Sequence, residues 1–91
     1  PASFTGAFGL KPSYGRIPRG PSDHWEYGDT SVVGPLTKTV EDGALFLDIV
    51  AGVSAHDPNS LPDPGVSYLD LVRAGMPEGL RIAYSPTLGY A

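Results

Sequence analysis

The segment that constrains the fold most runs from Val40 to Ala51 and is predicted to form a helix. Glu41 and Asp48 lie seven residues apart and therefore near one side of that helix. Apolar residues cover most of the remaining surface: Ala44, Leu45, Phe46, Leu47, Ile49, Val50 and Ala51. A helix with so few polar positions requires burial on most of its sides.

The rest of the chain offers little to bury such a helix. The 91 residues include 12 glycines and 10 prolines, close to a quarter of the chain, which predicts many loops and few long elements. A domain of this length would be marginally stable even with a good core. We therefore expect that a larger body or a second copy covers the Val40–Ala51 helix. The alternative is that this small domain wraps the helix alone.

Local signals define where the helices begin and end. Thr39 is predicted to cap the long helix, with Asp42 three residues later in a spacing that resembles a capping box. Gly52 is expected to end it. A second, short helix is predicted over Tyr68–Ala74, with Ser67 as its cap.

Three further segments are predicted to be short β-strands, which makes the chain a mixed α/β protein. They are Ala7–Leu10, Ser31–Val33 and Leu80–Tyr84. Arg16–Ile17 adds at most a brief strand inside a loop rich in proline and glycine.

Composition excludes several kinds of function. The absence of cysteine excludes disulfides and thiolate chemistry and fits a reducing compartment, so we expect a cytoplasmic location. A net charge of −4 without a basic patch argues against a nucleic-acid partner. No apolar run is long enough to cross a membrane, so we do not expect a membrane as a partner.

Individual residues give no convincing metal or cofactor site, and none is predicted. His24 and His56 are interpreted as loop histidines, because a metal site needs several ligands at suitable spacing. Asp57, Asn59 and Asp63 could suggest a calcium loop, but the required glycine and closing glutamate are absent, so we assign them to turns.

Catalytic and ligand-binding interpretations are equally weak on the residues alone. No serine stands in a Gly-x-Ser-x-Gly elbow, and Gly6–Gly9 lacks the context of a phosphate loop. Lys11 could act as a base or anion anchor, although a structural lysine is favoured. Trp25 and Tyr27 could line a ligand groove or simply anchor their loop, and the loop from 18 to 29 could be a substrate-side or surface insertion.

The residue order of two longer stretches is more informative. Residues 1–18, PASFTGAFGLKPSYGRIP, resemble the segment that follows the nucleophile in amidase-signature enzymes. Residues 34–42, GPLTKTVED, resemble that family's second characteristic stretch, and its apolar helix follows. Asp57-Pro58 and Leu80–Ser85 also fit, so the resemblance covers nearly the whole chain.

The resemblance implies a mixed-sheet α/β/α fold, of which residues 1–91 would be a single partial domain with short strands, one buried helix and long loops. It also implies a Ser-Ser-Lys triad in which a serine forms an acyl-enzyme and a lysine acts as base. Only Pro1 and Ala2 match the end of the nucleophile motif, which places the serine four residues before Pro1. The triad would lie upstream of Pro1, so we assign no catalytic residue to this chain and expect it to be inactive.

Three functional hypotheses remain open. The parent could be an amidase acting on a small-molecule amide, which we favour. It could be the A subunit of a glutamyl-tRNA amidotransferase, although that subfamily usually carries a Ser-Leu-Asp-like run where this chain has Asp29–Val33. The chain could also be a non-catalytic interaction module, and in any case the Val40–Ala51 helix could support self-association.

Overall fold

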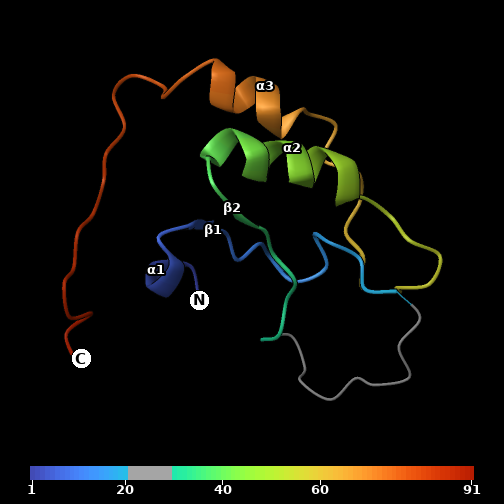
Figure 1. Cartoon of the computed structure of the whole chain (residues 1–91), viewed down its shortest axis with the longest axis horizontal. Coiled ribbons are helices and arrows are strands. Elements are labelled where there is room, and N and C mark those ends of the chain that lie inside the picture. Colours follow the sequence, from blue (N-terminus) through green and yellow to red (C-terminus); the bar gives the residue numbers. More distant parts are fainter. Residues whose placement is uncertain (21–29) are drawn as a thin grey trace.

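The computed structural model describes residues 1–20 and 30–91, which contain three helices and two strands. In chain order these are α1 (Ala2–Thr5), β1 (Phe8–Gly9), β2 (Leu36–Thr37), α2 (Val40–Val50) and α3 (Tyr68–Arg73). The two longer helices lie side by side above the small sheet, and α1 lies below it (Figure 1). This content is compatible with the predicted α/β class. The full α/β/α fold stays a prediction.

Helix α2 begins as its sequence predicts. The Thr39 hydroxyl accepts a hydrogen bond from the Asp42 N–H at 3.1 Å, which satisfies one of the free amides of the first turn. The helix ends at Val50, one residue earlier than expected, because Ala51 is already extended. Helix α3 is capped in the same way, with the Ser67 hydroxyl accepting from the Asp70 N–H at 3.1 Å.

The sheet is a single antiparallel pair in which Phe8 faces Thr37 and Gly9 faces Leu36. The strand expected at Ala7–Leu10 is therefore present but shorter. The strand expected at Ser31–Val33 is wrong, because the pairing residues follow Gly34–Pro35 instead of preceding it. The Leu10 N–H donates to the Pro35 carbonyl at 3.2 Å, which brings the two segments together just before the ladder begins.

Helix α1 was not predicted. It is one turn, and it ends at Gly6, whose φ of 66° is the left-handed conformation of a common helix C-terminus. The Thr5 hydroxyl donates to the Pro1 and Ala2 carbonyls at 3.3 and 3.2 Å. Pro1 before the turn and Gly6 after it were the available signals.

The loop of residues 52–66 is fastened to residues 13–19. The Leu61 N–H donates to the Gly15 carbonyl at 2.8 Å, and the Arg16 guanidinium donates to the Pro62 carbonyl at 2.8 Å. Gly15 has a φ of 79°, and any Cβ there would collide with the Asn59 carbonyl oxygen. The brief strand expected at Arg16–Ile17 is wrong, because this backbone forms a turn.

The prediction of one buried helix needs correction. Only one face of α2 is buried, and it consists of Gly43, Ala44 and Leu47. By contrast, Leu45 and Ile49 of the same helix are 46% and 74% exposed. Among the described residues, the buried apolar side chains are Ala44 and Leu47 of α2 and the loop prolines Pro12 and Pro35. The strands and α3 are too short to surround α2, so the alternative that this chain wraps the helix alone is wrong.

The dimensions of the chain agree with this open packing. Its radius of gyration is 15.4 Å, whereas a compact domain of this length would have about 12 Å. Its accessible surface is 7163 Å², whereas a folded monomer of 9.5 kDa would expose about 5,000 Å². The chain therefore leaves roughly 2,000 Å² more surface in water than a compact protein of its mass.

Every residue of the tail, defined here as residues 75–91, is exposed. Leu80–Tyr84 was expected to be a strand, but it pairs with no described segment and its residues are exposed. The tail runs from α3 down one side of the molecule (Figure 1). In residues 1–20 and 30–91, no helix combines the length and hydrophobicity that a membrane span requires, and the expected cytoplasmic location stays a prediction.

Candidate functional site

The best candidate for a functional surface is a hollow of about 300 Å³ beside α1, which we call the N-terminal hollow. It is bordered by Pro1, Ala2, Ser3, Gly9, Leu10, Lys11 and Leu36. Its walls therefore come from α1 and from both strands. They are mainly apolar, with Ser3 and Lys11 supplying the polar groups.

A close contact holds α1 against the sheet. A Cβ added to Gly9 would lie 2.6 Å from the Ala2 Cβ and 3.2 Å from the Leu36 side chain, so this position requires glycine. The Ala7 N–H also donates to the Ala2 carbonyl at 3.1 Å, which folds the chain back at Gly6. The shape of the hollow therefore depends on the close approach of α1 to the backbone of Gly9.

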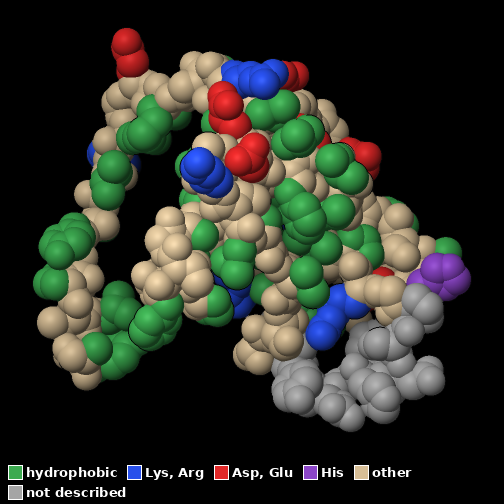
Figure 2. Space-filling model, in the orientation of Figure 1, with side chains coloured by type: hydrophobic (Ala, Val, Ile, Leu, Met, Phe, Trp, Pro, Cys, Tyr) green, Lys and Arg blue, Asp and Glu red, His purple; other side chains and the backbone are tan. Residues whose placement is uncertain are grey.

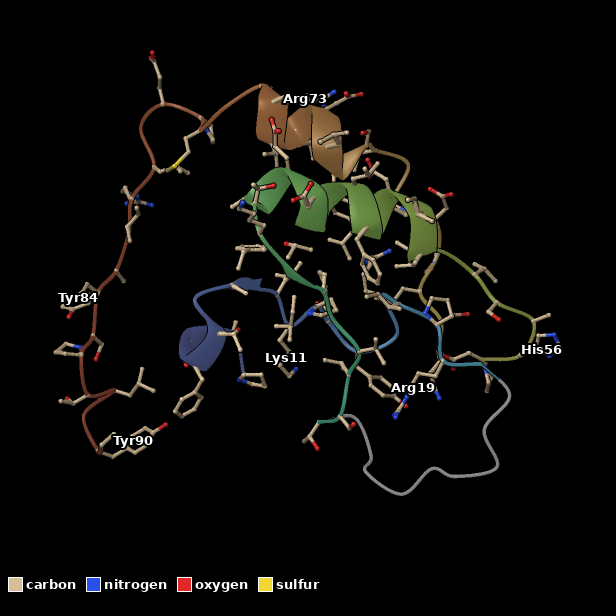
Figure 3. All side chains as sticks on the ribbon, viewed as in Figure 1. Lys11, Arg19, His56, Arg73, Tyr84 and Tyr90 are labelled. Atoms are coloured by element: carbon tan, nitrogen blue, oxygen red, sulfur yellow. The ribbon has the colours of Figure 1, made fainter. Side chains whose placement is uncertain are left out.

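Lys11 lies on the exposed border of this hollow, followed by the buried Pro12 (Figure 3). No hydrogen bond joins Lys11 to Ser3 within residues 1–20 and 30–91. The hollow can shape and line a site.

A second hollow, the helix groove, lies between α2, α3 and β1 and measures about 260 Å³. It is lined by Phe8, Leu10, Val40, Gly43, Ala44, Leu47, Tyr68, Leu71 and Val72. Apolar side chains gather over and beside α2 in the space-filling view (Figure 2). With almost no polar lining, the groove can bind apolar groups but offers no reactive chemistry.

Asp48 joins the two long helices. Its carboxylate, on α2, accepts hydrogen bonds from the Tyr68 N–H at 2.6 Å, the Leu69 N–H at 3.1 Å and the Ser67 hydroxyl at 2.8 Å. Desolvation raises the pKa of the Asp48 carboxyl, but these three hydrogen bonds lower it, and the net pKa lies below the ordinary value. An exposed ion pair between Glu41 and Arg73, 3.9 Å apart, adds a weaker link between the same helices.

Comparison with known proteins assigns the sequence of this chain to a family. The family described as Amidase matches residues 1–91, the full length of the chain. An acylamidase of Rhodococcus erythropolis is 42% identical over 93 residues, which cover 98% of this chain and 18% of the relative. The chain belongs to the amidase family. The resemblance stated from residues 1–18 and 34–42 is thereby confirmed.

Other similar proteins are subunits of an amidotransferase. The A subunit of glutamyl-tRNA(Gln) amidotransferase from Methylacidiphilum infernorum is 44% identical over 77 residues, covering 76% of this chain and 14% of the relative. The same subunit from Salinibacter ruber is 39% identical over 82 residues, covering 90% of this chain and 16% of the relative. The chain thus spans less than a fifth of these relatives. No solved structure matches it.

Of the residues weighed as candidates, Lys11 and His56 lie on different parts of this amidase-family chain (Figure 3). His56 is exposed at one end of the molecule and its backbone N–H donates to the Ser54 hydroxyl at 3.2 Å (Figure 3). No cluster of three metal-binding side chains occurs among the described residues. His24, Trp25 and Tyr27 lie outside the described residues.

The interpretation of Asp57 as a turn residue is confirmed. Its carboxylate accepts from the Asn59 N–H at 2.9 Å, as in an Asx-turn, and from the Arg19 N–H at 2.9 Å. Asp57 is only 7% exposed, so it serves as a buried fastening between the loop and residues 13–19. Sequence reasoning missed Asp48 as a second fastening, since its partners lie 19 to 21 residues away.

Proposed function

We propose that this chain is the part of an amidase that follows the catalytic serine, and that it supports the active site without containing its reactive groups. The observation that carries the proposal is the family match across residues 1–91, together with 42% identity to an acylamidase. The parent would hydrolyse a carboxamide bond in a small molecule.

The proposed chemistry is that of a Ser-Ser-Lys triad, implied by resemblance. The nucleophilic serine oxygen attacks the amide carbonyl while its proton passes through the second serine to the lysine. Backbone amides stabilise the oxyanion, the amine leaves with a proton, and water then releases the acid from the acyl-enzyme. All these groups would precede Pro1.

The N-terminal hollow supplies the role of this chain in that chemistry. In the proposed register the nucleophile is four residues before Pro1, so α1 and the strands next to it would form a wall beside the acyl-enzyme. The contact between Gly9 and Ala2 supports this role because it fixes α1 against the sheet. A wall held in this way would keep the nucleophile segment in place.

A second candidate function is that of the amidotransferase, in which ammonia released from an amide passes to a partner. The relatives from Methylacidiphilum infernorum and Salinibacter ruber favour it, at 44% and 39% identity. The acylamidase matches a larger share of the chain, 98% against 76% and 90%, and we therefore rank the amidase first.

The experiment compares the 91-residue chain with its full-length parent on a panel of simple amides and on glutamine. We expect hydrolysis by the parent, none by the chain alone, and loss of the parent's activity when the serine four residues before Pro1 is replaced by alanine. Turnover by the purified chain would refute the proposal. Activity of the parent on glutamine alone, with ammonia passed to a partner, would favour the amidotransferase.

A third outcome concerns the interaction module. If the 91-residue chain sediments as one stable assembly of defined size, a module that self-associates through the Val40–Ala51 helix is favoured. We expect variable self-association or poor stability instead, because Ile49 and Leu45 are exposed and no described part of the chain covers them.

A further inference from the structure

The first 20 residues of this chain are positively charged, although the chain as a whole is acidic. They contain Lys11, Arg16 and Arg19 and no acidic residue, so all ten acidic side chains come later in a sequence of net charge −4. These residues include α1, β1 and most of the border of the N-terminal hollow. A concentration of one sign of charge attracts ligands of the opposite sign, so this part of the chain favours an anion.

Two of the three cations already have partners. The Arg16 guanidinium donates to the Pro62 carbonyl at 2.8 Å, and the Arg19 guanidinium donates to the Ser31 carbonyl at 3.4 Å. Lys11 is exposed and has no hydrogen bond or ion pair within the described part of the chain. Its ammonium group is therefore available to an anion.

The surface beside Lys11 is small and apolar. The N-terminal hollow measures about 300 Å³, at the lower end of the range for ligand sites in proteins. Its lining is mainly apolar, Ser3 adds one hydroxyl, and none of its bordering residues is acidic among those that the structure describes. Lys11 lies on its border, on the side of the sheet away from α2 and α3 (Figure 3). The hollow therefore offers apolar contact and one positive charge at its edge.

One ammonium group matches one carboxylate. A phosphate carries nearly two negative charges and three acceptor oxygens, so it would require further donors beside Lys11. In the described border, Ser3 is the one additional polar side chain. A neutral apolar ligand would leave the ammonium without an anion, and a carboxylate without an apolar part would not fill the hollow. The ligand that fits both parts is an apolar chain that ends in a carboxylate.

We propose that the N-terminal hollow is a substrate subsite of the parent, that it takes an apolar chain ending in a carboxylate, and that Lys11 binds this carboxylate. The inference rests on the proposed function, in which α1 forms a wall beside the acyl-enzyme. It names the substrate class as amides with one carboxylate away from the amide bond, on the acyl part or on the amine part. Lys11 then determines specificity and takes no part in bond breaking.

Steady-state kinetics of the full-length parent on two matched pairs of amides tests the proposal. Adipic acid monoamide is compared with hexanamide, which places the carboxylate on the acyl part. N-acetyl-ε-aminocaproate is compared with N-hexylacetamide, which places it on the amine part. We expect the acidic member of at least one pair to have a kcat/KM about 5-fold or more above that of its neutral partner, mainly through KM. Equal kcat/KM within both pairs would overturn the inference.

The parent is the protein to test, because the α-amino group of Pro1 in the 91-residue chain would add a second cation to the same border. Lys11→Met should remove the preference for the acidic substrate, and Lys11→Arg should retain most of it. Lys38→Met is the matched control, because Lys38 is also exposed but does not border the hollow. Equal loss in Lys11→Met and Lys38→Met would overturn the inference, since the general field of the protein would then explain the preference.

Calorimetric binding of hexanoate to the parent separates the inference from the proposed function. We expect hexanoate to bind the wild type about 5-fold more tightly than it binds Lys11→Met. Binding that depends on Lys11 in a folded parent that hydrolyses no amide would contradict the proposed function alone. Hydrolysis of neutral amides without any such dependence would overturn the inference alone. If Lys11→Met fails to fold, the comparison of acidic and neutral amides in the wild type still decides.

Discussion

Two segments of this chain have similar composition and different structures. The loop of residues 52–66 contains three prolines and two glycines, and the tail of residues 75–91 contains two prolines and three glycines. The loop is fastened through Asp57, Leu61 and Pro62 to residues 13–19. The tail has only local turns among residues 85–91.

The difference shows that proline and glycine content does not decide whether a segment is tied to the body. What decides is whether backbone polar groups meet partners in the folded chain. The loop of residues 52–66 finds such partners because Gly15, which has no Cβ, lets the backbone at residue 15 approach the Asn59 carbonyl closely. The tail has only local hydrogen bonds, at Gly75 and among residues 85–91, and none that ties it to a distant described segment.

The largest expected effect comes from a matched pair of glycines. Gly15 and Gly79 have similar positive φ angles, 79° and 74°, but only Gly15 has an atom within reach of an added Cβ. Gly79→Ala should therefore lower the free energy of unfolding by at most about 1 kcal/mol, the cost of the left-handed conformation alone. Gly15→Ala should add a collision with the Asn59 carbonyl and destabilise the chain by about 3 kcal/mol or more, or unfold it.

Urea denaturation followed by circular dichroism measures the two free energies of unfolding. Equal losses in both variants would mean that the loop is no more firmly attached than the tail. Such a result would remove the basis of the comparison.

An intermediate effect is expected from apolar truncations. Leu47 is 7% exposed in the helix groove, whereas Ile82 is 79% exposed in the tail. Leu47→Ala should lower the free energy of unfolding by about 2 kcal/mol, since the groove is already partly open. Ile82→Ala should change it by less than about 0.5 kcal/mol in the 91-residue chain. A comparable loss for Ile82→Ala would show that the tail packs onto the body.

The smallest effect concerns the link between α2 and α3. Because hydrogen bonds hold the pKa of Asp48 below its ordinary value, ionised Asp48 stabilises the folded chain above its unfolded pKa of about 4. That contribution should be lost as the pH falls through the folded pKa. Asp48→Asn should flatten this part of the pH dependence, while Asp63→Asn serves as a control with an unrelated carboxylate.

Denaturation midpoints between about pH 6 and pH 2 provide the measurement. The same acid loss in the wild type and in Asp48→Asn would exclude the carboxylate as a link between the helices. A tail that is independent of the body should keep the same protection factor over this range, that is, the same exchange rate relative to an unstructured chain at each pH.

Local signals predicted α2 and α3 well, whereas α1 was missed. Thr39 and Ser67 lie at the helix starts they were expected to cap, because a cap depends on atoms only three residues apart. Strand positions were less accessible: β2 follows Gly34–Pro35 because Leu10 pairs with the Pro35 carbonyl, a contact 25 residues away in sequence. The exposure of Ile49 could not be predicted from its hydrophobicity, since it depends on what else surrounds α2.

The family could be predicted from residue order, and the role of single residues much less so. The stretches at residues 1–18 and 34–42 carried the resemblance that the amidase-family match confirms. The N-terminal hollow depends on the approach of Ala2 and Leu36 to Gly9, which no spacing rule describes. The position of the triad upstream of Pro1 stays a prediction.

The contact between Ala2 and Gly9 has a consequence for how this region can vary in evolution. The two positions share one small volume, so the side chain tolerated at either position depends on the size of its neighbour. Gly9→Ala alone would place its Cβ too close to the Ala2 Cβ. Gly9→Ala combined with Ala2→Gly keeps the total side-chain volume unchanged and should be tolerated better. Substitutions at positions 2 and 9 should therefore be epistatic, because a larger side chain at one position requires a smaller one at the other.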